Sequence, residues 1–210
     1  MLSLKRFVCG PLDNNVYLIV AEAQSVCALV DPGIAIDAVH RYIEQHGLQV
    51  ELLLLTHGHF DHAFSLGECA TLYPAALVAA HDGDIPMLQR IVETSSMWGI
   101  PGASDCPEIG IQLEHGKPVV LAGESIEVRH TPGHSPGQVA FIFGGNAVAG
   151  DTLFRRGIGR YDLPGADFAT LRDSILNQLY SLPDETVVWP GHGPETTIGE
   201  EKRENPFVPA

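Results

Sequence analysis

The stretch Thr56-His57-Gly58-His59-Phe60-Asp61-His62 directly follows an apolar run and contains four potential metal ligands. Two imidazoles two residues apart can converge on one ion if the backbone between them turns, and Gly58 gives the backbone that freedom. Asp61 and His62 follow where a turn opening a helix would direct both side chains at a second point nearby. The stretch predicts a centre for two metal ions. The alternative is a polar surface loop, because histidines can cluster by chance in a chain that carries ten of them.

Three later segments supply further ligands in equivalent settings. Residues 125–131, 146–149 and 185–189 are short strand-like runs, and each leads through Gly or Pro to a ligand. These ligands are His134, Asp151 and His192. Functional groups collect beyond the carboxyl ends of strands in sheets that helices cover, so the strand endings can meet in one crevice. A chance cluster would not repeat this arrangement, and the metal centre is the favoured interpretation.

Composition limits the class of protein. The 210 residues fit one domain, expected to span residues 1–210. The formal net charge of −14 opposes binding to nucleic acid or to an anionic membrane surface. Residues 1–7 lack a signal-peptide core, and the apolar run 52–55 is too short to cross a bilayer. The four cysteines lack C-x-x-C spacing, which is typical of reduced, packed thiols. We expect a soluble cytoplasmic protein.

Apolar periodicity and turn residues predict alternating strands and helices. Strands are expected at residues 4–9, 15–20, 25–30, 50–55, 77–80, 125–131, 146–149 and 185–189, with another that ends at Phe143. Helices are expected from Ile36 to Gly47, from Asp61 through Ala70, over residues 84–97, and from Phe168 with Asp167 as N-cap. Residues 99–110 are a loop rich in Gly and Pro. Two mixed sheets with helices outside them would fit this α/β pattern.

The ligand pattern resembles the metallo-β-lactamase superfamily, whose H-x-H-x-D-H motif is matched at residues 57–62. The later ligands follow in the order of that family, and residues 29–33, Leu-Val-Asp-Pro-Gly, resemble an early motif whose aspartate supports the site. The resemblance covers nearly the whole chain and implies an αββα sandwich with helices on the outer faces. It implies one metal on His57, His59 and His134, a second metal on Asp61, His62 and His192, and Asp151 as the bridge between them.

Within that superfamily, residues 150–154 (Gly-Asp-Thr-Leu-Phe) and 205–207 (Asn-Pro-Phe) resemble glyoxalase II, a group of thioesterases acting on S-acylglutathiones. The chain departs from the larger enzymes at Gly58, where they have histidine, and at Arg160 and Asp162, where they have lysine and tyrosine. It also lacks their helical substrate domain. Residues 159–162 are more similar to compact glyoxalase II-like proteins, and also to persulfide dioxygenases.

The chemistry can be built from the ligands. Two divalent ions sharing Asp151 would lower the pKa of a bridging water from about 15.7 to near 7, and the resulting hydroxide could attack an acyl carbonyl. Asp61 and Asp151 are the predicted catalytic residues, because they can orient that hydroxide. A leaving thiol with a pKa of about 8.5 requires no strong general acid. Zinc is the expected metal, with iron or manganese as alternatives.

Basic residues gather in two segments of this acidic chain, residues 155–160 and 202–203. We interpret them as a patch that holds a substrate carboxylate, and the predicted substrate-binding residues are Arg160, Tyr161, Lys202 and Arg203. The alternative is ordinary solvated charge, or pairing with Asp162 and Asp167. His40, His46, His115 and His130 are not expected to bind metal, and residues 81–84 are interpreted as a turn that starts a helix.

Three functions remain open. The first is a dinuclear zinc hydrolase of small anionic thioesters such as S-lactoylglutathione. The second is a mononuclear iron persulfide dioxygenase that uses His57, His134 and Asp151 as a triad of two histidines and one carboxylate. The third is a metal-binding protein without turnover. Metal identity and stoichiometry discriminate between the two enzymes.

Overall fold

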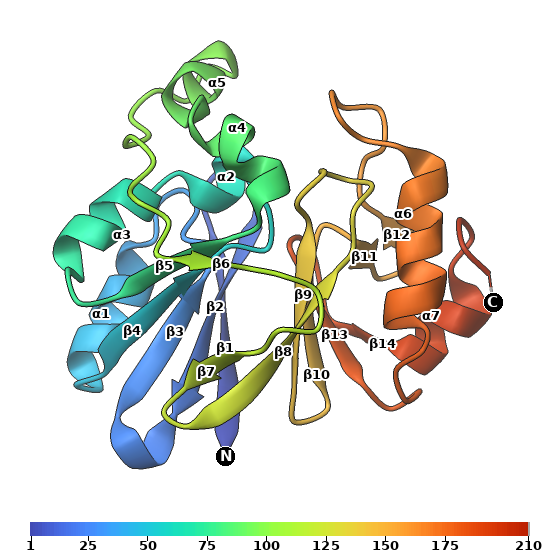
Figure 1. Ribbon diagram of the computed structural model, residues 1–210, viewed down its shortest axis with the longest axis horizontal. Helices are drawn as coiled ribbons and strands as arrows, with labels where there is room; N and C mark the ends of the chain where they lie inside the picture. The colour runs from blue at the N-terminus through green and yellow to red at the C-terminus, as the bar shows by residue number, and fades with distance from the viewer. Residues whose placement is uncertain (210) are drawn as a thin grey trace.

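Two six-stranded sheets face each other at the centre of the protein, with helices on their outer sides (Figure 1). The computed structural model describes residues 1–209. The first sheet runs in the order β1 (Leu2–Cys9), β2 (Asn14–Ala21), β3 (Val26–Val30), β4 (Gln49–Leu54), β5 (Leu77–Ala80) and β6 (Ile111–Gln112). The second runs in the order β14 (Thr196–Thr197), β13 (Val187–Pro190), β10 (Asn146–Gly150), β9 (Val139–Phe143), β8 (Glu124–His130) and β7 (Val119–Leu121). Both sheets mix parallel and antiparallel pairs, so the predicted fold class is confirmed.

Helices cover the outer face of each sheet. The first sheet carries α1 (Asp37–Gln45), α2 (Phe60–Ala63), α3 (Leu66–Leu72), α4 (Ile85–Leu88) and α5 (Ile91–Met97). The second carries α6 (Phe168–Ser174), its π-helical continuation Ile175–Leu179, and α7 (Ile198–Glu204). A small pair, β11 (Leu153–Phe154) and β12 (Gly157–Ile158), lies beside α6. No helix among residues 1–209 combines the length and the apolar character needed to cross a membrane.

Strand β2 shows why the two layers pack. Alternate residues of a strand point to opposite faces of the sheet. Val16, Leu18 and Val20 belong to the apolar cluster under the helices of the first sheet. Tyr17 and Ile19 belong instead to the cluster between the sheets, where they join Phe141 and other residues of the second sheet. The strand is therefore buried on both faces, which holds the sheets together.

The cysteines are free, and Cys9, Cys27 and Cys69 are buried in the cluster under the first sheet. Burial raises the pKa of Cys27 and of Cys69 to about 12. Their predicted role as packing residues is confirmed.

Two predicted helices are divided. The helix expected over residues 84–97 is α4 and α5, preceded by the 3₁₀ turn η2 (Asp82–Asp84). The helix expected after Asp61 is α2 and α3, separated at Ser65. The backbone N–H of Ser65 donates to Pro32 O (2.9 Å) and its hydroxyl donates to Gly33 O (2.7 Å). These contacts with a distant loop compete with helical hydrogen bonding and divide the segment.

Candidate metal centre

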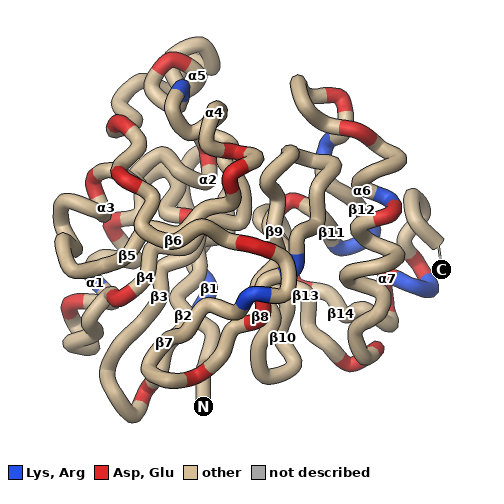
Figure 2. Tube along the Cα trace, in the orientation of Figure 1, with Lys and Arg blue, Asp and Glu red and all other residues tan. Residues whose placement is uncertain are grey.

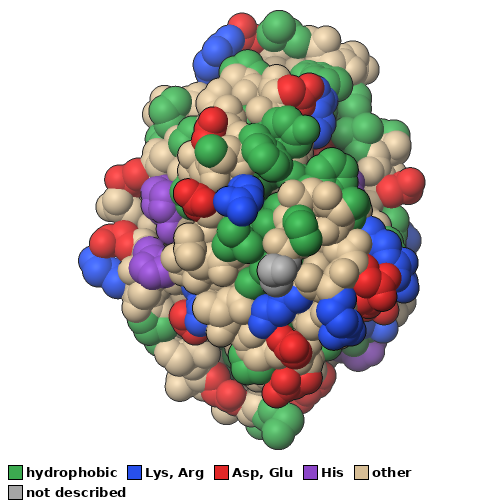
Figure 3. Space-filling view, turned by 90° about the vertical axis from the view of Figure 1, so that its right-hand side faces the viewer, with side chains coloured by type: hydrophobic (Ala, Val, Ile, Leu, Met, Phe, Trp, Pro, Cys, Tyr) green, Lys and Arg blue, Asp and Glu red, His purple; other side chains and the backbone are tan. Residues whose placement is uncertain are grey.

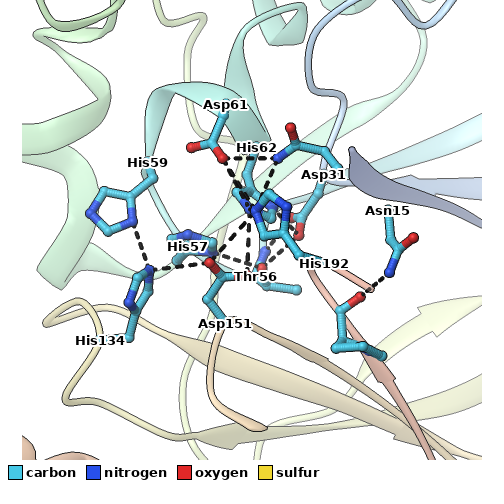
Figure 4. Close-up of polar contacts among 12 residues, drawn as sticks. Asn15, Asp31, Thr56, His57, His59, Asp61, His62, His134, Asp151 and His192 are labelled. Atoms are coloured by element: carbon cyan, nitrogen blue, oxygen red, sulfur yellow. Dashed lines mark hydrogen bonds and ion pairs between the residues drawn. The ribbon is translucent and has the colours of Figure 1, made fainter. Parts of the chain in front are cut away.

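Seven potential ligands lie close together where strands of both sheets end (Figure 4). His57 and His59 follow β4, and Asp61 and His62 lie on α2. His134 follows β8, Asp151 follows β10, and His192 follows β13. The structure therefore brings together every residue predicted to bind metal, from positions as far apart in the chain as His57 and His192.

His57, His59 and His134 form the first triad. Their ligand nitrogens lie within 4.8 Å of one another. Nδ1 of His59 lies 2.8 Å from Nε2 of His134, while Nε2 of His57 is buried without a hydrogen-bond partner among the described residues. Three potential ligand nitrogens thus lie close enough together to bind one metal ion.

Asp61, His62 and His192 form the second triad, whose ligand atoms also lie within 4.8 Å of one another. Nε2 of His192 lies 3.2 Å from Nε2 of His62 and 3.4 Å from Oδ2 of Asp61. This triad offers one carboxylate oxygen and two imidazole nitrogens.

Asp151 lies between the triads. Its Oδ2 is 3.5 Å from Nε2 of His134 and 3.8 Å from Nε2 of His192, and its Oδ1 is 3.5 Å from Nε2 of His62. That Oδ1 is buried and has no hydrogen-bond partner among residues 1–209. One carboxylate therefore reaches both triads, as a bridging ligand must.

These residues fit two divalent cations. Pairs of imidazole nitrogens face each other at hydrogen-bond distance, and a buried nitrogen and a buried carboxylate oxygen lack partners. Buried polar atoms without partners are costly, and cations coordinated by these atoms would satisfy them. A set of imidazole and carboxylate donors suits zinc, iron or manganese.

Hydrogen bonds on the outer side of the ligands orient the rings. Nδ1 of His62 donates to Oδ2 of Asp31 (3.1 Å), and Nδ1 of His134 donates to the carbonyl oxygen of Arg160 (2.8 Å). Nδ1 of His192 donates to the carbonyl oxygen of Leu12 (3.0 Å). Each of these bonds directs the lone pair of Nε2 toward the centre, which is the tautomer that a metal ligand needs.

Asp31 orients a further ligand through Thr56. The hydroxyl and the N–H of Thr56 both donate to the Asp31 carboxylate, at 2.6 and 2.7 Å. Because the hydroxyl proton is engaged there, Thr56 Oγ1 accepts from Nδ1 of His57 (3.0 Å) and leaves Nε2 facing the centre. Asp31 is almost fully buried, and it holds an unusual backbone φ of 52°. Its supporting place agrees with the resemblance of residues 29–33 to the early family motif.

Burial and the neighbouring charges shift the pKa values of these residues in different directions. Burial, reinforced by the neighbouring imidazoles, lowers the pKa of His57 well below its usual value and that of His59 to about 4. Burial alone would lower the pKa of His62, but Asp151, Asp61 and Asp31 outweigh it and raise that pKa to about 10. Burial would likewise raise the pKa of Asp61, yet His62 and His192 hold it well below the usual range. His57 and His59 are therefore neutral and Asp61 is ionised, which are the forms that bind metal.

Two buried side chains that contact the centre were not recognised in the sequence. Asn14 donates from Nδ2 to Oδ2 of Asp61 (2.9 Å), and Asp84 accepts from the N–H of Gly58 (2.8 Å). Asn14 directly precedes the strand expected at residues 15–20, and Asp84 lies in the segment interpreted as a turn that starts a helix. Asp84 lies four residues beyond β5, and its position after a strand end, like that of the ligands, is the signal that could have found it.

The predicted substrate residues lie in two places. The backbone carbonyl of Arg160 contacts His134, whereas the Arg160 side chain is exposed and pairs with Asp162 (2.9 Å). Tyr161 packs against Phe168. Lys202 and Arg203 lie on α7, where Lys202 pairs with Asp184 (2.6 Å). No hydrogen bond or ion pair within residues 1–209 joins either α7 side chain to the metal ligands, and their contact with substrate stays a prediction.

The basic patch is interleaved with acidic side chains. Lys and Arg gather around β11, β12 and α7, where the Cα trace also carries acidic residues (Figure 2). Arg155 pairs with Glu200, and Arg156 pairs with Glu200 and Glu204. Figure 3 shows the same alternation of basic and acidic groups on the surface. Much of the positive charge near the centre is thus already compensated.

The other histidines lie apart from the ligands. His40 contacts Tyr73, His46 contacts the carbonyl of Tyr42, and His81 stacks on His130 with ring centroids 4.1 Å apart. The candidate metal clusters within residues 1–209 contain none of them.

Comparison with known proteins gives a consistent family. The family model described as the metallo-beta-lactamase superfamily matches residues 9–192. The hydroxyacylglutathione hydrolase GloC of Haemophilus influenzae is 36% identical over 184 residues, which cover 86% of each chain. The probable metallo-hydrolase YqgX of Bacillus subtilis is 33% identical and covers 97% of this chain and 96% of its own.

Solved structures agree with this result. BLEG-1, described as a B3 metallo-beta-lactamase, superimposes with a TM-score of 0.91 and 31% identity over 99% of this chain and 100% of its own. TTHA1623 in a di-iron-bound form gives a TM-score of 0.87 and 40% identity over 97% of this chain and 100% of its own. ETHE1 from Myxococcus xanthus gives 0.79 and 29% over 97% of this chain and 83% of its own.

Proposed function

The chain belongs to the metallo-beta-lactamase superfamily, and we propose that within it the protein hydrolyses glutathione-type thioesters such as S-lactoylglutathione. The observation that carries this proposal is the pair of ligand triads joined by Asp151. The similarity to GloC, whose name describes a hydroxyacylglutathione hydrolase, supports the thioester as substrate class.

The ligands would divide two ions between them, with His57, His59 and His134 on one side, Asp61, His62 and His192 on the other, and Asp151 shared. Bound divalent ions supply Lewis-acid polarisation of a carbonyl and lower the pKa of water from about 15.7 to about 7. Asp61 and Asp151 can accept hydrogen bonds from the attacking water and so orient it toward the acyl carbon. The departing thiolate has a conjugate-acid pKa of about 8.5 and needs no strong proton donor.

Arg160 and Tyr161 are proposed to contact the substrate. The Arg160 carbonyl holds His134, so this segment adjoins the centre, and the guanidinium can exchange Asp162 for a substrate carboxylate. An exposed ion pair of this kind is weak, which makes the exchange inexpensive. We also propose Lys202 and Arg203 as substrate-binding residues, because they add positive charge to the patch around β11, β12 and α7.

Zinc is the proposed metal, and iron is the main alternative because TTHA1623 is described in a di-iron-bound form. A cytoplasmic location is proposed from the free cysteines, since reduced thiols persist in a reducing compartment.

A mononuclear iron persulfide dioxygenase is the competing enzyme. His57, His134 and Asp151 could provide its iron ligands, and Nε2 of His134 does lie 3.5 Å from Oδ2 of Asp151. That function leaves the convergence of Asp61, His62 and His192 without a purpose, whereas the hydrolase uses it. A binding protein without turnover is the third candidate, and it does not account for a complete ligand set.

Metal content and activity test the proposal together. The purified protein is prepared without chelators, its metals are measured, and S-D-lactoylglutathione hydrolysis is followed. We expect about two zinc ions per chain and turnover. Asp61→Ala should lose one ion and most of the activity. The control His46→Ala should retain both ions and the full activity. One iron per chain, with dioxygenase activity that survives Asp61→Ala, would overturn the hydrolase in favour of the dioxygenase. Two ions without turnover of any thioester would leave the binding protein.

A further inference from the structure

We infer that Asp84 and Asn14, two buried side chains outside the ligand motifs, each position one half of the metal centre. This inference rests on the proposed binding of two ions. Both residues are only 1% exposed. Neither belongs to a triad, and their hydrogen bonds divide between the triads.

Asp84 joins the two loops that carry the first triad. Its Oδ2 accepts from the N–H of Gly58 (2.8 Å), the residue between His57 and His59, and from the hydroxyl of Ser135 (2.7 Å). Its Oδ1 accepts from the N–H of Gly137 (2.6 Å). Ser135 and Gly137 lie just after His134. One carboxylate therefore ties His57 and His59, which extend from the first sheet, to His134, which extends from the second.

The fit around Asp84 leaves little room for movement. A Cβ atom at Gly58 would lie 2.9 Å from Cβ of Asp84, and one at Gly137 would lie 2.7 Å from its Cγ. Real Cβ atoms essentially never approach other atoms so closely. The two glycines thus let both ligand loops pack directly against the Asp84 side chain, and the distance between the loops follows from its size.

Asn14 performs the corresponding task at the second triad. Its Nδ2 donates to Oδ2 of Asp61 (2.9 Å) and lies 3.5 Å from Nε2 of His192. Its backbone forms an isolated bridge with His192, and the following N–H, that of Asn15, donates to the carbonyl of Gly191 (2.7 Å). Its Oδ1 is buried without a partner among the described residues. Asn14 therefore links Asp61, from the first sheet, to His192, from the second.

This division predicts effects confined to one metal site. Removing a group that orients a ligand typically lowers metal affinity by about 10- to 100-fold. Replacement of Asp84 should weaken the first site and leave the second unchanged. Replacement of Asn14 should do the reverse. A residue that only maintains the fold would weaken both sites together.

Single-site proteins allow each site to be measured alone. His192→Ala retains the complete first triad, and His134→Ala retains the complete second triad. Asp84→Asn and Asn14→Ala are introduced into each of these proteins. The zinc dissociation constant is measured by competition with a chromophoric chelator, and the melting temperature of the chelator-treated protein reports on the fold. Asp82→Asn and Asp13→Asn, exposed neighbours outside the centre, are the matched controls.

We expect Asp84→Asn to raise the zinc dissociation constant about 10- to 100-fold in the His192→Ala protein only, and Asn14→Ala to do so in the His134→Ala protein only. Equal weakening at both sites, or no weakening at either, would overturn the inference. If Asp84→Asn does not fold, Ser135→Ala removes one hydrogen bond of Asp84 and should weaken the first site selectively. Failure of the parent protein to bind zinc or iron would instead refute the proposed function.

Discussion

Asp151, the proposed bridging ligand, is closely approached by two glycines. A Cβ at Gly159 would overlap its backbone oxygen, and a Cβ at Gly191 would overlap its Oδ1 and lie 2.7 Å from Cε1 of His62. The shared ligand is therefore held by backbone that approaches closely only because these two positions lack side chains.

Gly191→Ala should displace the Asp151 carboxylate and reduce the bound zinc, because the added methyl group occupies the position of Oδ1. Metal analysis of the purified variant measures this effect. Gly157→Ala is the control, since its Cβ would make an ordinary contact of 3.5 Å with Phe154. Full zinc content in Gly191→Ala would show that the loop can shift without cost to the ligand.

Arg160→Ala should lower kcat/KM for a glutathione thioester by about ten- to a hundredfold if a charge-assisted hydrogen bond to a substrate carboxylate is lost. The loss should fall mainly on KM if the contact is equally strong in the ground state. The comparison substrate is an uncharged thioester with the same leaving-group pKa, which should be affected much less. Equal losses on both substrates would mean that the Arg160 side chain acts through structure, by keeping in place the segment whose backbone carbonyl accepts from His134.

The short helix α2 carries two ligands of the second triad, and its own hydrogen bonds are too few to hold it. The loop 31–33 and Ser65 supply the missing restraint, through the bonds from Ser65 to Pro32 and Gly33. The break between α2 and α3 is thus the place where the helical layer attaches to the loop that contains Asp31.

Ser65→Ala should cost about 1 to 3 kcal/mol of unfolding free energy, because it leaves the carbonyl of the buried residue Gly33 without its side-chain partner. Denaturant unfolding of the zinc-loaded protein measures this. Ser96→Ala is the control, since that hydroxyl is exposed and bonds only within its own helix, to Val92 O. A cost no larger than that of the control would show that Ser65 does not hold α2.

Ligands from both sheets meet at the centre. His57, His59, Asp61 and His62 extend from the first sheet, and His134, Asp151 and His192 extend from the second. Bound ions would therefore connect the two layers at one edge, while the apolar cluster between the sheets connects them through the interior.

Removal of metal by a chelator should lower the melting temperature without unfolding the protein, because the apolar cluster between the sheets remains. An ion at a free concentration of 100 times its dissociation constant stabilises the folded state by about 2.7 kcal/mol. Thermal unfolding at several zinc concentrations measures the shift, and readdition of zinc should reverse it. In Asp61→Ala the zinc dependence should be smaller. A melting temperature that is independent of zinc in the parent protein would contradict this expectation.

Local pattern was sufficient to predict the strands that lead to the ligands and the capping of α6, where Asp167 accepts from the N–H of Thr170 (2.7 Å). Periodicity and turn residues act between near neighbours in the chain, so they can be interpreted without a structure. The ligand motif and its family resemblance likewise identified the fold, and they indicated residues that the structure then brought together.

The packing of the two sheets decided the rest. Asn14 and Asp61 are 47 residues apart in the chain, and Asp84 and Gly137 are 53 apart, so no local pattern joins them. The same is true of Arg156 and Glu204, whose pairing compensates charge that the sequence had suggested for substrate. Nε2 becomes the inward nitrogen of His62, His134 and His192 because a distant carboxylate or carbonyl lies behind each ring and accepts from Nδ1. Such partners meet only when the strands have docked, because hydrogen bonds depend on distance in space and not on separation along the chain.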